Sequence, residues 1–429
     1  MIKGIKVKLY PTKEQEILMW KSAGVKRVAY NHGLAQMNDY YEANKHQEKK
    51  SERYMSATDA REQYDIYKKS VVGDNDEKYL LSPSQDVSQG AFQDLKKAFS
   101  NFAKGKAKLP KFKSKNKSTP SFYHDPRKLK VSKNRVYFEK IGWVKMKDEG
   151  RLPQGDYKEK DSGNVALYIK HQVCNPRIKF DGKMWYLAVA LEQEVQIEKS
   201  NNLSIGIDLG LRNLAVTNVP GLVIKNINKD KKVKKYEKRK ARQQRRLSRK
   251  REANIKNKVY YKTGEKKGQL KSFEYVRPLR DCKNYQKQRR ALARTHRKLT
   301  NVRNNHLHQA TNTIIKQKPS KIVMESLNIK GMMKNKHLSK SIAQAKWYEF
   351  RRQMEYKAKS RLGFKVTFVD GFYPSSQLCS SCGIKYNSKI QPEGKWSLKI
   401  DKWTCQSCGS SHDRDINASI NLANYSVPA

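Results

Sequence analysis

The chain has 429 residues, and its 92 lysines and arginines against 40 aspartates and glutamates give a formal net charge of +52 at pH 7. Such a chain repels itself unless a polyanion neutralises it, so we expect nucleic acid as a partner; a solvated lysine-rich surface and an anionic membrane are the weaker alternatives. It has no run of 18 apolar residues and no apolar signal-peptide stretch at the N-terminus, which predicts a cytoplasmic location and no membrane partner.

The N-terminal half changes from strand to helix and back to strand. Residues 2–10 have the apolar alternation of a strand, and residues 12–105 have the pattern of helices, with Thr12 as the expected cap of the first. Strand patterns return in residues 129–194. Several short strands without helices predict a small β-barrel or sheet. We expect the first strand to belong to it, with the helices inserted between.

The C-terminal half begins with three short strands in residues 201–227. A strongly basic helix follows over residues 229–251, and a long helix is predicted over 284–316. Then come a strand, a helix over 343–362, another strand and a terminal helix. This element order is that of an RNase H-like domain, although a likeness of folds does not by itself establish a function.

Four of the six cysteines form two C-x-x-C pairs with 22 residues between them: Cys379, Cys382, Cys405 and Cys408. Each pair can place two thiolates on one side of a metal, so the two pairs together can complete a tetrahedron of sulfur ligands. A glycine follows each pair and allows the tight turn that such a site needs. We therefore expect a structural Zn²⁺, with an iron–sulfur cluster as the alternative.

Three acids stand where a predicted strand or helix meets its end. Asp208 and Glu325 each end an apolar strand, and Asp415 precedes the terminal helix. Three carboxylates that converge could hold two Mg²⁺ ions, which activate water and stabilise the leaving oxygen in phosphodiester cleavage. Taken singly, the three could instead be a turn cap, a surface acid and a helix N-cap. The three acids can form a metal site only if the fold brings them together.

Motifs along nearly the whole chain resemble those of the TnpB family, RNA-guided nucleases that are encoded by insertion sequences and related to compact type V CRISPR effectors. The matching segments are GIDLGLRNLAV, IVMESLNIKGM, YPSSQLCSSCG, WTCQSCGSSHDRDINASINLA, KVKLYPTKEQE, KLPKFKSK and SIAQAKWYEFRRQMEYKA. Residues 257–282 depart from the family by being longer than its usual link. We interpret this segment as an RNA-contacting insertion, with a tolerated loop as the alternative.

The resemblance implies an α+β multidomain fold with a β-barrel wedge domain, a helical recognition domain, an RNase H-like (RuvC) α/β nuclease domain and a zinc-binding insert. The expected bounds are 1–11 with 106–200, then 12–105, then 201–375 with 412–429, and finally 376–411. It further implies that Asp208, Glu325 and Asp415 are the catalytic Mg²⁺ ligands and that the paired cysteines bind Zn²⁺. Ser326 stands where family members often have a second acid, which leaves this triad intact.

The resemblance also implies a guide RNA and a double-stranded target DNA, which is cut beside a short motif that the protein reads. As nucleic-acid contacts we predict arginines that follow a phosphate backbone and two glutamines whose amides suit adenine edges. These residues are Arg239, Arg242, Arg245, Arg246, Arg249, Gln85 and Gln89. We expect a monomer rather than a homodimer.

Other functions fit parts of the same sequence. A compact type V CRISPR effector would share the scaffold. An RNA-guided DNA-binding repressor without cleavage is possible, but the intact set of three acids argues against it. A basic RNA-binding protein with a zinc knuckle would have no reason to place acids at strand ends, and a strand-joining transposase ranks last.

Overall fold

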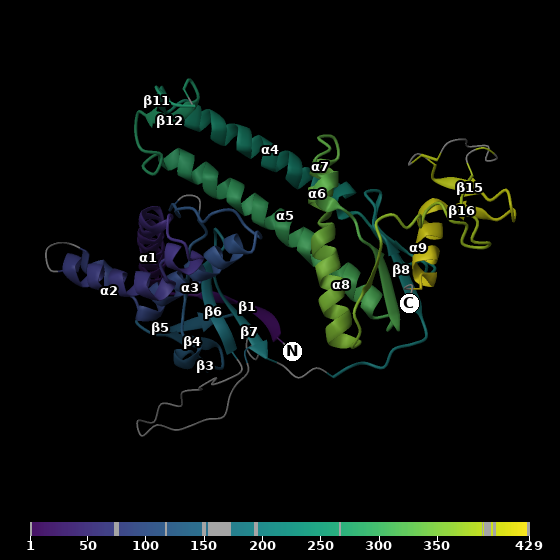
Figure 1. The fold of residues 1–429 in the computed structure, drawn as a ribbon, viewed down its shortest axis with the longest axis horizontal. Helices are drawn as coiled ribbons and strands as arrows, with labels where there is room; N and C mark the ends of the chain where they lie inside the picture. Colours follow the sequence, from purple (N-terminus) through teal and green to yellow (C-terminus); the bar gives the residue numbers. More distant parts are fainter. Residues whose placement is uncertain are drawn as a thin grey trace. The chain divides into compact units, whose positions relative to one another are not determined.

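The structure is a computed structural model, in which residues 2–72, 77–115, 118–147, 152, 173–192, 196–265, 267–387, 389, 396–397 and 400–426 are described. The strand pattern expected at 164–172 lies outside these residues. The chain divides into two compact units, Met1–Glu194 and Val195–Ala429 (Figure 1). Within the described parts of the chain, no helix has the length and apolar character needed to cross a membrane.

The first unit contains a seven-stranded antiparallel sheet in the order β2-β6-β7-β1-β5-β4-β3. Its strands are β1 (Ile2–Tyr10), β2 (Ser121–Tyr123), β3 (Lys130–Ser132), β4 (Arg135–Phe138), β5 (Gly142–Met146), β6 (Val173–Phe180) and β7 (Trp185–Glu192). The first strand joins the two halves of the sheet, because residues 2–8 pair with β7 while Leu9 and Tyr10 pair with β5. The prediction that this strand belongs to the sheet is confirmed.

Of the predicted β-barrel or sheet, the described residues form a sheet, and the expected β-barrel is wrong for them. Closure requires the two edge strands to pair with each other. Here the edges are β2 and β3, each three residues long, and each pairs on one side only, with β6 and β4 respectively. The sheet of the first unit is therefore open among the described residues.

Three helices lie between β1 and β2, as predicted: α1 (Lys13–Asn44), α2 (Ala57–Val72) and α3 (Gln85–Ala103). The first begins with the expected cap, since Thr12 accepts a bond from the amide of Gln15 and the Gln15 side chain accepts one from the amide of Thr12. Helices α1 and α3 approach closely at Gly33, where a Cβ would lie 2.4 Å from the Phe92 ring. Short 3₁₀ helices are η1 (Lys50–Arg53), η2 (Glu77–Leu80) and η3 (Pro126–Lys128).

The second unit is built on a five-stranded sheet in the order β10-β9-β8-β13-β14. Its strands are β8 (Ser204–Asp208), β9 (Asn213–Thr217), β10 (Val223–Lys225), β13 (Lys321–Glu325) and β14 (Thr367–Val369). The first three form an antiparallel meander, and β13 runs parallel to both β8 and β14. The three middle residues of β8 and of β13 are all buried, as expected for parallel strands covered on both faces.

The helices of the second unit are η4 (Ile227–Lys229), α4 (Lys231–Glu252), α5 (Lys283–Ile315), α6 (Ile329–Met332), α7 (Ser339–Ala345), α8 (Trp347–Arg361) and α9 (Arg414–Asn424). The helix predicted over 343–362 is present as α8 but begins later than expected, at Trp347, because Lys346 adopts a left-handed φ of 56° and separates α8 from α7. On α9 the apolar Ile416 is 44% exposed, whereas the polar Asn417 and Asn421 are buried.

Two small antiparallel ribbons complete the second unit: β11 (Ile255–Tyr260) with β12 (Leu270–Tyr275), and β15 (Lys402–Thr404) with β16 (Ser411–Asp413). Helices α4 and α5 lie side by side, and the β11–β12 ribbon lies at their far end (Figure 1). We call residues 229–315, which include α4, this ribbon and α5, the arm. The segment predicted as an RNA-contacting insertion therefore forms most of a two-stranded ribbon.

Candidate active site and metal centre

Asp208 and Glu325 end neighbouring parallel strands. The register of β8 and β13 pairs Ile207 with Met324, so the next residue of each strand emerges at the same edge of the sheet. The carboxyl ends of parallel strands are where open α/β sheets place their ligand sites. The fold therefore brings two of the three predicted acids together.

Gly206 allows helix α9 to lie directly on β8. A Cβ on this residue would lie 2.0 Å from the backbone oxygen of Ser419, so no other amino acid fits without moving the helix. Further back on the strand, the Ser204 hydroxyl donates to the backbone oxygen of Ala423 at 2.7 Å. The helix and the strand thus run in opposite directions, and the start of α9 lies beside the end of β8.

Asp415 is the second residue of α9, so this packing brings it to the other two acids. Burial, followed by the negative charges of Glu325 and Asp415, raises the pKa of Asp208 well above its ordinary value. The Arg414 guanidinium lowers the pKa of Asp208, and it also donates to Asp415 Oδ1 at 2.8 and 3.0 Å. A divalent cation would relieve the same repulsion. The three acids, which we call the acid edge, therefore suit a metal with oxygen ligands.

Asp413, and not Asp415, is the N-cap of α9. Its Oδ1 accepts bonds from the amides of Asp415 and Ile416 at 3.0 and 3.1 Å. The alternative in which Asp415 serves only as the helix cap is therefore wrong. Asp413 holds the first turn of the helix, and the Asp415 carboxylate engages Arg414 instead.

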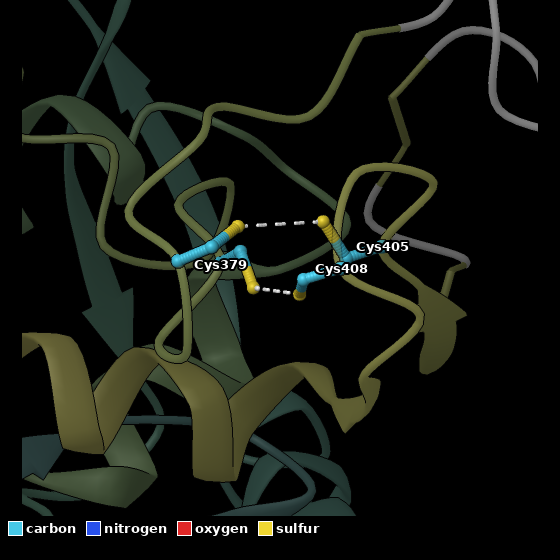
Figure 2. Close-up of side chains that lie close together, drawn as sticks. Cys379, Cys405 and Cys408 are labelled. Atoms are coloured by element: carbon cyan, nitrogen blue, oxygen red, sulfur yellow. Dashed lines mark hydrogen bonds between the residues drawn. The ribbon is translucent and has the colours of Figure 1, made fainter.

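The four paired cysteines form one cluster, which we call the cysteine cluster. Their sulfur atoms all lie within 4.8 Å of one another, and among the described residues no other group of ligand atoms meets this limit. Cys379 faces Cys408 at 3.6 Å, and Cys382 faces Cys405 at 3.7 Å, from two separate loops (Figure 2). Four sulfurs at this spacing fit a tetrahedral Zn²⁺.

Local turns build the two halves of the cysteine cluster. Gly383 and Gly409 follow the pairs with φ of 76° and 72°, a backbone that favours glycine. Their amides donate at 2.8 Å to the carbonyls of the first cysteine in each pair. Hydrogen bonds with Ser410 lower the pKa of the Cys408 thiol to about 6. Although a backbone hydrogen bond at Ile384 lowers the pKa of the Cys382 thiol, desolvation and the three neighbouring thiols outweigh it and raise this pKa to about 12, so the pKa values alone do not favour four thiolates.

His412 is a neighbour of the cysteine cluster. Its Nε2 lies 3.1 Å from the Cys379 sulfur, and its ring packs on Trp403 with centroids 4.9 Å apart. The group of ligand atoms within 4.8 Å contains the four sulfurs and does not include this imidazole. His412 belongs to β16 and contacts the Cys379 sulfur. The next residue in the chain, Asp413, is the N-cap of α9.

All five predicted arginines are exposed on α4: Arg239, Arg242, Arg245, Arg246 and Arg249. The interface of α4 with α5, which we call the seam, is small, since only Val233 and Gln243 of α4 are buried. In the first unit, Gln85 is exposed at the start of α3 and Gln89 is half-buried one turn later. The nucleic-acid contacts of these seven residues stay a prediction.

Three residues near the acid edge were not singled out from the sequence: Ser375, Asn417 and Asn421. All are buried, and they connect Glu325, the loop before Cys379 and helix α9. The spacing of the two asparagines was a usable signal, because residues four apart lie on one helical face.

Three family models match the chain. Residues 187–336 match one described as "Probable transposase", and this range includes Asp208 and Glu325. Residues 347–422 match one described as "Cas12f1-like, TNB domain", which includes the cysteine cluster and Asp415. Residues 1–46 match a "Helix-turn-helix domain", although here they form strand β1 and the single helix α1.

Two relatives match over almost the whole chain. A provisionally named RNA-guided DNA endonuclease from Streptomyces pristinaespiralis is 26% identical, over 98% of this chain and 88% of the relative. A provisionally named RNA-guided DNA endonuclease InsQ from Escherichia coli (strain K12) is 28% identical, over 98% of this chain and 91% of the relative.

A solved structure has a similar fold. A protein chain in the cryo-EM structure of the Cas12f1–sgRNA–target DNA complex aligns with a TM-score of 0.54 over 99% of each chain. The two sequences are 13% identical. The likeness is therefore one of fold, a mixed α/β architecture with open sheets.

Proposed function

Because the chain belongs to the TnpB family, we propose that it is an RNA-guided DNA endonuclease. The observation that carries the proposal is the convergence of Asp208, Glu325 and Asp415 at one edge of the sheet. In such an enzyme the guide RNA reads the target by base pairing, and the protein reads only a short motif beside it.

The acid edge is the proposed Mg²⁺ site. Mg²⁺ held by carboxylates polarises water and stabilises charge on the phosphodiester oxygens. The negative charges of both Glu325 and Asp415 act on Asp208, so a bound cation would relieve this repulsion. Arg414 donates to Asp415 Oδ1 and balances the charge of that carboxylate within the protein.

The topology supports an RNase H-like (RuvC) assignment for residues 201–375 with 412–429. Three antiparallel strands are followed by two parallel ones, and the acids lie at strand and helix ends. We assign residues 376–411 to a Zn²⁺-binding target nucleic-acid domain, which the cysteine cluster supports. We further assign residues 1–11 with 106–200 to a wedge domain and 12–105 to a helical recognition domain.

The arm is the proposed surface for the guide RNA. Residues 229–298 contain 29 lysines and arginines against 6 acids, a net charge of +23 out of the +52 of the whole chain. The seam between its helices buries few side chains, so most of these cations are left for a phosphate backbone. On the β11–β12 ribbon, Tyr260 is 48% exposed and can stack on an unpaired base.

The test is to purify the protein with the RNA that it carries, sequence that RNA, and supply DNA that pairs with its guide in the presence of Mg²⁺. We expect cleavage beside a fixed flanking motif. Asp208→Ala should lower the cleavage rate by at least about 1000-fold while the RNA and the target DNA still bind, because the acid edge contacts the reacting phosphate. Cleavage by the alanine variant at the wild-type rate would overturn the assignment of the site.

A further inference from the structure

Glu325 is held by a serine from a different part of the chain. Ser375 Oγ donates to Glu325 Oε1 at 2.5 Å, and the serine is 3% exposed. Ser375 lies in the loop between β14 and the first cysteine pair, four residues before Cys379. Glu325 is half-buried, and a hydrogen bond to a charged carboxylate is stronger than a bond between neutral groups.

Ser375 is in turn fixed by helix α9. The Asn421 side chain donates to the backbone oxygens of Ser375 and Leu378, both at 2.7 Å. One turn earlier, the Asn417 amide donates to the same oxygen of Leu378 at 2.6 Å and accepts from the Ser380 amide at 2.9 Å. The two asparagines are 7% and 1% exposed, so their bonds do not compete with water. The loop that carries Ser375 is thereby attached to the helix that carries Asp415.

We propose that Ser375 is a positioning residue for the Glu325 carboxylate. Its hydroxyl fixes Oε1 of Glu325, and the carboxylate held in this way would bind a cation together with Asp208 and Asp415. The inference rests on the proposed function, because it assigns Ser375 a role in holding a ligand of the proposed metal. Asn421 supports the same arrangement by fixing the backbone of the serine.

The physical reason is the freedom of the glutamate side chain. A ligating carboxylate that can rotate must be ordered when the metal binds, whereas a hydrogen-bonded one is already oriented. Loss of such a partner typically costs about 10–100-fold in metal affinity or activity. A serine that only filled space would have a different effect, because its loss would change stability and leave metal binding alone.

The experiment compares three variants of the complete protein with its bound RNA. Ser375→Ala removes the donor, Ser375→Thr retains it, and Ser419→Ala is the matched control. Ser419 is fully buried, and its hydroxyl donates to the backbone oxygen of Ile416 at 2.7 Å without touching an acid. Two quantities are measured for each variant: the dissociation constant of Mn²⁺ by electron paramagnetic resonance, and the Mg²⁺ concentration for half-maximal cleavage.

We expect Ser375→Ala to raise both quantities by about 10-fold or more, and Ser375→Thr to stay within about threefold of the wild type. Ser419→Ala should lower the melting temperature as much as Ser375→Ala but leave both quantities unchanged. Equal values for Ser375→Ala and Ser419→Ala would overturn the role of Ser375. If the wild-type protein binds Mn²⁺ but does not cut DNA, the proposed function fails, while the Mn²⁺ measurements still decide the role of Ser375.

Discussion

The acid edge and the cysteine cluster adjoin in space but are assembled by different means. Each half of the cysteine cluster is a tight turn within five residues, closed by a glycine with positive φ. The acid edge has no such local origin, since Asp208, Glu325 and Asp415 come from two strands and a helix. Gly206 serves this edge by leaving space for the backbone of α9.

Because the two regions are assembled differently, two kinds of substitution should affect them independently. A change within a turn should affect the cysteine cluster and leave the sheet intact. A change in the packing of α9 on β8 should move Asp415 away from Asp208 and leave the turns intact. The loop from Ser375 to Ser380 is the point where the two regions meet.

The largest effect is expected at the cysteine cluster. Cys405→Ser should forfeit most of the free energy of Zn²⁺ binding, which is on the order of 10 kcal/mol for structural sites. We expect residues 376–411 to become sensitive to protease and the protein to lose one equivalent of zinc by elemental analysis. Cys174→Ser, an exposed cysteine in the first unit, is the control. Full zinc content and wild-type protease resistance in Cys405→Ser would refute the zinc site.

The next effect is expected at Gly206. Replacing it with alanine places a Cβ against the α9 backbone, and overpacking of this kind costs about 3 kcal/mol. We expect a lower melting temperature and a large loss of cleavage, with zinc content unchanged. Gly4→Ala is the control, because this glycine is also in a strand but a Cβ added to it would have no other atom within 4 Å. Equal stability of the two variants would contradict the close packing.

A smaller effect is expected at the cap of α9. Asp413→Ala removes the acceptor for two helix amides, and loss of such a cap costs about 1–2 kcal/mol. Asp413→Asn keeps an acceptor and should recover most of this stability. Chemical denaturation of the three proteins measures the difference. The cap assignment fails if the alanine and asparagine variants unfold at the same denaturant concentration.

The smallest effect is expected at Asp208, where a substitution should raise the free energy of unfolding instead of lowering it. The pKa of Asp208 is raised in the folded state, so its contribution to stability is present at low pH and is lost as pH rises through the folded value. At pH 7.5 the buried Asp208 carboxyl is costly to ionise beside the other two acids, and Asp208→Asn removes this cost. The substitution should therefore raise the free energy of unfolding by about 1 kcal/mol in Mg²⁺-free buffer, while it abolishes cleavage. The gain should vanish near pH 4, and Asp281→Asn, on the exposed arm, should show none. A destabilised Asp208→Asn at pH 7.5 would contradict the crowding of the three acids.

Much of the architecture was predictable from local patterns. Strand β1, the capping of α1 by Thr12 and the order of elements in the second unit follow from apolar periodicity and cap residues, and they are confirmed. The break at Lys346 was not predictable in this way, because a left-handed residue between two helical patterns leaves the apolar period intact. The division into four domains and the nucleic-acid contacts of Gln85 and Gln89 stay predictions.

The sequence by itself determined each half of the cysteine cluster, because two residues between cysteines fix the reach of a single turn. It also determined which acids end a strand and how strongly charge gathers in the arm. Only the tertiary structure decided that Asp208, Glu325 and Asp415 meet, that Asp413 rather than Asp415 caps α9, and that Ser375 reaches Glu325. The reason is that spacing along a chain sets distances only within one element or turn, whereas the approach of separate elements depends on packing such as that of α9 on Gly206.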